Sequence, residues 1–407
     1  MDPTRANELI ERVRSLPAAA PLVRCLGERD VRGPHLVGGA VRDLLMGGEP
    51  DDLDLVVEGD PVVLAMALGG EVQVHDRFAT ATVFAEGFTY DIARARRETY
   101  AVPGALPAVS PAGLEEDLQR RDFTVNAIAI ALGPPEPGRL TAGGGALEDL
   151  GAGRLRVLHD RSFIDDPTRL LRLVRYASRL GFVAEARTHE LARAAVRARV
   201  IASVSGSRIG AELRLLARER DPIAALFALA ELELDSSIHP GFRLDDPALA
   251  HRALALLPGD GRRDLLALGL AARGVPGAEL ASLLDSLAFA GADRDTILAT
   301  AARGERTAAA LAEATLPSEI GTVLQDAGPE LVALAGALGP AARAREWLER
   351  LRKVSLAIDG DDLIAAGIPE GPAIGRGLRA ARAAKLDGRT DGPEDELTQA
   401  LGGARER

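Results

Sequence analysis

The chain has 407 residues, enough to bury a large core and form two to four domains, and its net charge is −11 at pH 7. That charge argues against indiscriminate binding of nucleic acid over the whole surface. A single cysteine, Cys25, excludes a disulfide framework and a cysteine-based zinc site. No stretch resembles a signal peptide or is apolar enough to span a bilayer, so we expect a cytoplasmic protein with no membrane partner and no disulfide partner.

The first third of the chain alternates short apolar runs with helical patterns. The expected strands lie at 35–39, 53–59, 80–87 and 88–95, and the expected helices at 40–47 and 61–69. This alternation is typical of a domain that mixes strands and helices. The Gly- and Pro-rich stretch 132–145 is expected to close that domain.

Beyond residue 160 the apolar residues recur every three to four positions, which predicts helices. Residues 166–181 show this pattern most clearly, and it continues at 221–234, 251–259 and 345–358. We find no internal repeat of fixed period. We therefore predict the α+β class, with a mixed N-terminal domain followed by an all-helical remainder.

The segment 151–220 carries fifteen arginines and seven acidic residues, so it is basic within an acidic chain. A local excess of arginine indicates a confined anion-binding surface. The alternative is a solvated helical face.

Residues 38–54 read GGAVRDLLMGGEPDDLD and end in two aspartates separated by one residue. Asp52 and Asp54 lie at the start of a predicted strand, so their side chains point to the same face. Two neighbouring carboxylates repel each other unless a cation binds between them, and Mg²⁺ prefers oxygen ligands. We predict that Asp52 and Asp54 are catalytic ligands of Mg²⁺, the alternative being a solvated strand end.

Gly38 and Gly39 follow a predicted strand and open a predicted helix, so their backbone N–H groups could approach a phosphate. Arg42, on the first turn of that helix, would add a charged donor. With the two aspartates, this arrangement predicts nucleotidyl transfer assisted by two metal ions, one holding a triphosphate and one activating a hydroxyl. Asp91, on a later predicted strand, is a candidate third catalytic carboxylate, the alternative being a structural role.

Asp166, Arg169, Arg172 and Arg175 recur every three residues and form a winding stripe on a predicted helix. Asp166 can only accept hydrogen bonds when ionised, and Arg169 can only donate them. Such a pair fits cytosine and adenine, which present an amino donor beside a ring acceptor, and leaves polar groups unpaired against uracil and guanine. The alternative is a helical ion pair contributing about 0.2–0.5 kcal/mol.

The sequence GGAVRD followed by DLD resembles the signature of the polymerase-β nucleotidyltransferase superfamily. It is more similar to the class II branch, which contains tRNA CCA-adding enzymes and bacterial poly(A) polymerases. Further similar segments follow in the family's order: LEEDLQRRDFTVNAIAI (114–130), DDPTRLLRLVRYASRLGF (165–182), VSGSRIGAEL (204–213) and, near the C-terminus, 358–388.

The resemblance implies a polymerase-β-like head at 1–150, then an elongated all-helical part. That part comprises a neck at 151–220, which reads the base, a body at 221–340, and a tRNA-binding tail at 341–407. The implied activity is template-independent addition or repair of the 3′-terminal CCA of tRNA from CTP and ATP, with release of pyrophosphate. The implied partners are the tRNA 3′ end, ATP and CTP.

The resemblance also implies nucleotide-binding roles for seven residues. Asp166 and Arg169 would read the base, Arg172 and Arg175 would help to hold the nucleotide, Arg121 would contact the triphosphate, and Asp122 and Asn126 would lie near the ribose. For Arg121 the alternative is a solvated helix start. The chain departs from the family pattern at Asp165, usually Glu; at LTAGGG (140–145), which lacks an Asp; and at Ser207, usually Glu.

Related activities remain open: addition of A alone, of CC alone, or of poly(A). The loop 96–109, present where the family's specificity-switching loop is expected, disfavours a CC-only enzyme. Residues 341–407 hold twelve basic and twelve acidic residues, which ranks poly(A) polymerase lower. A small-molecule nucleotidyltransferase would lack the Asp–Arg pair and the long helical part, and a non-catalytic RNA-binding module would lack the aspartates.

Overall fold

The structure is a computed structural model, and contacts within the chain divide it into two compact units, Met1–Ser205 and Gly206–Arg407. The residues that it describes are 3–28, 33–50, 52–75 and 79–405. The four-part division into head, neck, body and tail stays a prediction.

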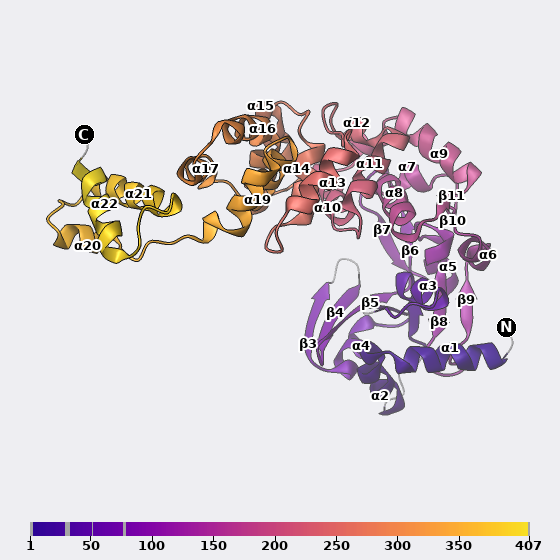
Figure 1. Ribbon diagram of the computed structural model, residues 1–407. Helices are drawn as coiled ribbons and strands as arrows, with labels where there is room; N and C mark the ends of the chain where they lie inside the picture. The colour runs from indigo at the N-terminus through magenta and orange to yellow at the C-terminus, as the bar shows by residue number, and fades with distance from the viewer. Residues whose placement is uncertain (1–2, 29–32, 51, 76–78, 406–407) are drawn as a thin grey trace. The chain divides into compact units, whose positions relative to one another are not determined.

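A seven-stranded sheet forms the centre of the first unit, with the strand order β3-β4-β5-β2-β1-β8-β9 (Figure 1). The strands are β1 (His35–Val37), β2 (Leu53–Val57), β3 (Glu71–His75), β4 (Thr80–Ala85), β5 (Phe88–Arg94), β8 (Ile128–Ala131) and β9 (Leu140–Ala142). β2 and β5 are parallel, and the other neighbours are antiparallel. This mixed sheet, followed by a helical remainder, confirms the predicted α+β class.

Helices cover most of one face of the sheet. They are α1 (Pro3–Ser15), α2 (Ala20–Glu28), α3 (Gly39–Leu45) and α4 (Pro61–Leu68). Leu53, Leu55 and Tyr90 point to this face and are buried in one apolar cluster with side chains of these four helices. Leu53 and Leu55 therefore point into the core, whereas Asp54 between them points to the other face.

The other face of the sheet is covered only in part. Helix α5 (Leu114–Gln119) packs Leu114 and Leu118 against Val37, Val56 and the neighbouring strand β8. Within that cluster nothing comes from β3 or β4. The half of this face that lies next to β5 is therefore left open, with Asp54 exposed at its border.

A two-stranded hairpin of β6 (Arg96–Thr99) and β7 (Ala108–Pro111) follows β5. Its connection has a positive φ of 72° at Gly104, and a Cβ atom there would come within 2.3 Å of Ser203 Oγ. Glycine at this position therefore lets the tip of the hairpin lie directly against the segment Val200–Ser203. The loop predicted at 96–109 is thus a hairpin with a fixed tip.

The rest of the first unit is mostly helical. Its elements are η3 (Thr124–Asn126), α6 (Ala146–Gly151), β10 (Arg154–Leu155), α7 (Ser162–Asp165), α8 (Thr168–Leu180), β11 (Val183–Ala184), α9 (Ala186–Arg197) and η4 (Val200–Ser203). The stretch 132–145, expected to close the first domain, contributes β9 to the sheet. Its glycines and prolines shape turns inside the unit.

The described part of the second unit is helical throughout. Its α-helices are α10 (Gly206–Ala217), α11 (Pro222–Phe227), α12 (Leu234–Ile238), α13 (Pro247–Leu256), α14 (Arg263–Ala271), α15 (Gly277–Ser286), α16 (Gly291–Glu313), α17 (Pro317–Leu324), α18 (Pro329–Ala337), α19 (Ala341–Glu349), α20 (Gly360–Ala365), α21 (Pro372–Leu386) and α22 (Pro393–Arg405). Separate apolar clusters lie around Trp347 and around Leu363.

Among the described residues, no helix combines the length and the apolar composition that a bilayer crossing requires. Cys25 is buried and carries a free thiol.

Candidate active site

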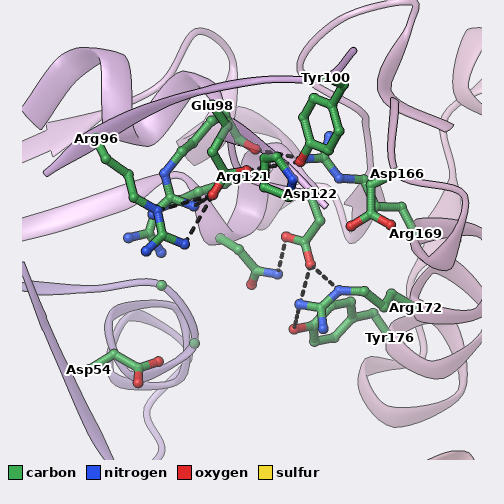
Figure 2. A pocket seen from close by; sticks show the side chains of 15 residues that line it. Asp54, Arg96, Glu98, Tyr100, Arg121, Asp122, Asp166, Arg169, Arg172 and Tyr176 are labelled. Atoms are coloured by element: carbon green, nitrogen blue, oxygen red, sulfur yellow. Dashed lines mark hydrogen bonds and ion pairs between the residues drawn. The ribbon is translucent and has the colours of Figure 1, made fainter. Parts of the chain in front are cut away.

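A cavity of about 410 Å³ opens in the first unit beside β2 (Figure 2). Of the residues predicted to form the site, nine line this cavity: Gly38, Gly39, Asp54, Arg121, Asp122, Asn126, Asp166, Arg169 and Arg172. They come from segments more than a hundred residues apart in sequence. The predicted residues Asp52, Asp91, Arg42 and Arg175 are not part of its lining.

Two of the three predicted carboxylates, Asp54 and Asp91, share one face of the sheet. Asp54 of β2 lies directly opposite Asp91 of β5, and Asp52 immediately precedes β2. All three side chains are exposed. Thr82 of β4 donates a hydrogen bond from Oγ1 to Asp91 Oδ1 at 2.7 Å, which orients that carboxylate.

The protein around Asp54 disfavours its negative charge. Desolvation by the surrounding protein raises the pKa of Asp54 above its ordinary value, and the charges of Asp91 and Asp52 raise it further, whereas Arg121 opposes the rise. A divalent cation would relieve this repulsion. In the described part of the chain no three His, Cys, Asp or Glu side chains converge as a complete metal site. The carboxylate oxygens of Asp54 and Asp91 are donors of the kind that a hard divalent cation prefers.

Arg121 lies against the backbone at Gly38, where φ is 71°. A Cβ atom at Gly38 would come within 2.9 Å of Arg121 Nη1 and within 4.0 Å of Asp54 Oδ2, so glycine is required for this close approach. Asp117, which is fully buried, fixes Arg121 by accepting a hydrogen bond from Nη2 at 3.0 Å. Arg121 Nε is buried without a hydrogen-bond partner. A guanidinium group at a cavity wall fits an anionic ligand, which its accessible N–H groups can bind.

The predicted role of the Gly38 amide needs a correction. Its N–H donates to the carbonyl of Ile128 at 3.1 Å, so it continues the pairing of β1 with β8. It is therefore not available for a phosphate. Gly38 serves the site instead by leaving room for the guanidinium group of Arg121.

Arg42 is buried, with 2% of its surface exposed, and it lies behind the cavity wall. Its Nη1 donates to Asn126 Oδ1 at 2.7 Å, and Asn126 Nδ2 donates to Asp122 Oδ1 at 2.9 Å. Arg42 thus fixes the amide orientation of Asn126. In this structure its contacts are with the protein around the cavity.

Asp122 is a permanently ionised carboxylate. Although burial alone would raise its pKa, the charge of Arg172 and hydrogen bonds from Asn126 and Arg172 lower the pKa of Asp122 to about 2. Arg172 donates from Nε at 2.9 Å and from Nη2 at 2.6 Å, both to Asp122 Oδ2. The backbone N–H of Phe123 donates to Oδ1 at 2.8 Å. Asp122 and Arg172 therefore position each other at the cavity wall.

The predicted base-reading pair lies on the opposite wall from Asp54 (Figure 2). Asp166 Oδ1 accepts hydrogen bonds from the backbone N–H of Thr168 at 3.1 Å and from Thr168 Oγ1 at 2.6 Å, so the carboxylate has a fixed rotamer at the start of α8. Arg169 Nη1 donates to Ser162 Oγ at 2.6 Å, and Nη2 donates to the carbonyl of Arg120 at 2.7 Å. Both side chains line the cavity in fixed orientations.

Two tyrosines were not predicted to belong to the site. Tyr176, one helical turn after Arg172, is surrounded by the guanidinium groups of Arg42, Arg172 and Arg175 at 5.4, 5.6 and 4.9 Å from its ring centroid. These are cation–π contacts, and they explain the position of Arg175 outside the cavity lining. The spacing of Arg172, Arg175 and Tyr176 on one helix was the only sequence signal for this cluster.

Tyr100 belongs to the hairpin connection and also lines the cavity. Its hydroxyl donates to Glu98 Oε2 at 2.9 Å, and Glu98 Oε1 accepts from Arg120 Nη1 at 2.9 Å. Burial and the negative charge of Glu98 raise the pKa of Tyr100 above its ordinary value. Tyr100 is therefore uncharged and forms part of the cavity wall close to Asp166 and Arg169.

Comparisons with known proteins place these features in a family. Residues 34–156 match the poly A polymerase head domain. The chain is 34% identical to a CC-adding tRNA nucleotidyltransferase of Deinococcus radiodurans, an alignment that covers 89% of this chain and 87% of that protein.

Two other relatives are A-adding tRNA nucleotidyltransferases. The chain is 33% identical to that of Geobacter sulfurreducens, over 98% of this chain and 49% of the relative, and 43% identical to that of Halalkalibacterium halodurans, over 58% and 55%. The chain thus spans about half the length, or less, of the first curated relatives that it matches.

The fold is similar to that of solved CCA-adding enzymes. An apo form has a TM-score of 0.83 and 28% identity, covering 98% of both chains. A Thermotoga maritima enzyme complexed with tRNA has a TM-score of 0.77 and 27% identity, covering 98% of both chains. A complex with CTP has a TM-score of 0.80 and 28% identity, covering 99% of both chains.

Proposed function

Because this chain belongs to the class II tRNA nucleotidyltransferase family, we propose that it transfers nucleotidyl groups from CTP and ATP to the 3′ end of tRNA and so completes or repairs the CCA sequence. One observation carries the proposal. A cavity bordered by the exposed Asp54 also contains a fixed Asp–Arg pair, Asp166 and Arg169, on another wall.

Nucleotidyltransferases generally use divalent metal ions, and we propose Mg²⁺ for this chain, with Asp52 and Asp54 as its protein ligands. When bound, Mg²⁺ would neutralise the triphosphate and lower the pKa of the attacking hydroxyl. Asp91, oriented by Thr82, lies beside this pair as the third carboxylate. The 3′ oxygen of the RNA forms a bond to the α-phosphorus, and pyrophosphate leaves.

Different walls of the cavity would bind different parts of the nucleotide. Arg121, whose side chain lines the cavity beside Gly38, would bind the triphosphate. Asp122 and Asn126 would lie at the ribose, where a permanent carboxylate can accept a hydrogen bond from a sugar hydroxyl. Arg172 and Arg175 would act indirectly, because their contacts with Asp122 and Tyr176 stabilise the wall.

The base would be chosen by the protein side chains. Asp166 would accept a hydrogen bond from the exocyclic amine of cytosine or adenine, and Arg169 would donate to the adjacent ring nitrogen. Uracil and guanine present the opposite polarity and would leave both side chains unpaired. The pair therefore supports acceptance of both CTP and ATP.

We also propose the division into a head at 1–150, a neck at 151–220, a body at 221–340 and a tRNA-binding tail at 341–407. The match of the head-domain family to residues 34–156 supports the first part. The cytoplasm, where tRNA is available, is the proposed location.

Addition of A alone is the second candidate. The 43% identity to an A-adding enzyme favours it. The Asp–Arg pair is compatible with both candidates, because adenine and cytosine present the same polarity to it.

The test uses tRNA transcripts that end before C74, after C75 and after A76, each incubated with one nucleoside triphosphate and Mg²⁺. We expect CTP incorporation on the first, ATP incorporation on the second and none on the third. Incorporation of ATP on the second together with no CTP incorporation on the first would support the A-adding alternative. Absence of incorporation on every transcript would contradict both.

A further inference from the structure

The open half of the sheet begins immediately beside the catalytic carboxylates. On β4, the residues that face away from the buried core are Thr80, Thr82 and Phe84. Phe84 is 54% exposed, an unusual position for a phenylalanine in a central strand. Helix α5 covers only the part of this face around β1, β2 and β8, and more than half of the Phe84 surface stays exposed.

The strand register fixes the distance between this ring and the site. Asp91 lies directly opposite Thr82, and Phe84 is two residues farther along β4, so Phe84 is the diagonal neighbour of Asp91. Diagonal neighbours in an antiparallel pair are about 7–8 Å apart. That distance is comparable to the spacing of successive nucleotides in an extended strand.

The reaction requires its two substrates on opposite sides of the carboxylates. The nucleotide cavity borders β1 and η3, with Gly38, Arg121 and Asn126 in its lining. In an in-line displacement the attacking hydroxyl enters opposite the leaving pyrophosphate. Since the sheet order is β4-β5-β2-β1, the RNA 3′ end approaches from the side of β4 and β5.

The chemistry of the open face selects bases rather than phosphates. On this face, Thr82 and Phe84 and the residues paired with them across the neighbouring strands are the ones nearest the site. They are Glu71, Gln73, Thr82, Phe84, Thr89, Asp91 and Asp54. None of these seven residues is a lysine or an arginine, and three are acidic, so the surface repels the RNA backbone. An exposed aromatic ring on an open sheet is a stacking platform for an unpaired base.

We propose that Phe84 stacks against a base at the 3′ end of the RNA acceptor and thereby places the terminal hydroxyl at Asp54 and Asp91. This inference rests on the proposed function and adds a binding site for the second substrate. Phe84 binds the acceptor on one side of the carboxylates, and Arg169 and Asp166 bind the nucleotide on the other.

The test measures acceptor binding and turnover for Phe84→Ala, Phe84→Tyr and the matched control Val74→Ala. Val74 is 46% exposed on the neighbouring strand, but it pairs with Ala81 and so belongs to the opposite face. The acceptor is a tRNA transcript ending in CC, with 2-aminopurine in place of its last or penultimate base. Stacking on an aromatic ring quenches the fluorescence of 2-aminopurine.

For Phe84→Ala we expect the quenching to be lost and KM for the transcript to rise by roughly 5- to 150-fold, the effect of one lost base–aromatic stack. KM for ATP should stay unchanged, because the ring lies outside the nucleotide cavity. Phe84→Tyr should restore both properties, and Val74→Ala should alter neither.

Three outcomes would overturn the inference: retained quenching in Phe84→Ala, an equal effect in Val74→Ala, or a change in KM for ATP alone. Dissociation of a wild-type dimer in Phe84→Ala, seen by sedimentation with unchanged acceptor KM, would assign the ring to a contact between copies of the chain. If the wild-type protein adds no nucleotide to any acceptor, the proposed function itself fails, and this inference fails with it.

Discussion

At the residue scale, the site depends on charged groups that fix one another before any substrate binds. Asp122 receives hydrogen bonds from Phe123, Asn126 and Arg172, and its pKa falls to about 2. Asp166 and Arg169 are likewise fixed by neighbouring hydroxyl and carbonyl groups. Such preorganisation would let the proposed base-reading pair discriminate a base without rearranging its own side chains.

The base-reading pair gives a direct prediction. Arg169→Ala and Asp166→Ala should each reduce the ratio of kcat/KM for CTP over UTP by roughly 10- to 150-fold, because a lost charge-assisted hydrogen bond no longer separates the two bases. Steady-state kinetics on a tRNA transcript that lacks CCA provides the ratio. Arg179→Ala is the matched control, since Arg179 is exposed on the same helix and lies outside the cavity lining.

If both variants lose CTP and UTP incorporation equally, the ratio does not change. Asp166 and Arg169 would then have structural roles at the start of α8, consistent with the contacts of Asp166 to Thr168.

Asp54 gives a prediction about pH. The pKa of Asp54 is raised in the folded protein. Ionisation of Asp54 therefore destabilises the folded protein as pH rises through this raised pKa. The destabilisation vanishes below the pKa of Asp in the unfolded chain, about 3.9. Asp54→Asn should therefore raise Tm at pH 7 in the absence of divalent cations, and the gain should shrink toward pH 4. Thermal unfolding from pH 4 to pH 8 measures it.

The control for this experiment is Asp326→Asn, which changes an exposed aspartate of the second unit. Added Mg²⁺ should stabilise the wild-type protein more than Asp54→Asn. A lower Tm for Asp54→Asn in metal-free buffer at pH 7 would contradict the repulsion inferred among the three carboxylates.

At the element scale, the sequence predicted the strands and helices whose apolar residues keep a regular period. Strands β1, β2, β4 and β5 and helix α8 fall within the predicted segments. Other strands lacked that signal. All four residues of β8 are buried, so they do not alternate, and four of the five residues of β3 are exposed.

The spacing of apolar residues did not predict the hairpin β6–β7, for a different reason. Its first strand, Arg96–Thr99, is charged and is stabilised by ion pairs, with Arg96 bound to Glu98 and Arg97 bound to Glu116. The ion pair of Arg97 joins residues 19 positions apart, and apolar periodicity gives no signal for such a contact.

The same limit applies to the site. The spacing of Asp52 and Asp54 predicted carboxylates on one face, but the pairing of Asp54 with Asp91 required the sheet register. The direction of the Gly38 amide depended on Ile128, ninety residues away. Motif spacing located the participants, whereas tertiary contacts decided which of them face the cavity.

The hairpin tip gives a prediction at this scale. Gly104→Ala places a Cβ atom against Ser203 and should displace Tyr100 and Glu98 from the cavity. Gly388→Ala is the matched control, because its φ of 71° is nearly the same and its Cβ would meet no atom within 4 Å. Both variants should lose about 1 kcal/mol of stability from backbone strain.

Only Gly104→Ala should lose catalytic efficiency, by up to about 100-fold, because a shift of about 1 Å in a positioning group can cost that much. Equal kcat/KM values for ATP in the two variants would show that the hairpin tip does not position the cavity wall.

At the scale of the whole molecule, an acidic protein must bind a polyanion through a limited surface. In helix α9, Arg193 and Arg197 are one turn apart and exposed, and neither has an ion-pair partner among the described residues. Replacing both with glutamine should weaken tRNA binding and reduce the slope of log K against log salt by about 1.4–1.8, since two phosphate contacts are lost.

The matched control replaces Arg161 and Arg187, which are exposed in the same segment but form ion pairs with Asp165 and Asp160. Titration of labelled tRNA at several salt concentrations provides both slopes. An equal reduction in the two double variants would contradict a specific contact and indicate a general effect of net charge.

We propose that this chain builds a defined 3′ sequence on tRNA by reading bases with protein side chains. The most direct measurement sequences the products formed from a tRNA transcript without CCA, in the presence of Mg²⁺ and all four nucleoside triphosphates at equal concentration. We expect products that end in CCA and grow no further, and no product for Asp54→Ala. Products that carry U or G, a growing run of A, or unchanged transcripts with the wild-type protein would contradict it.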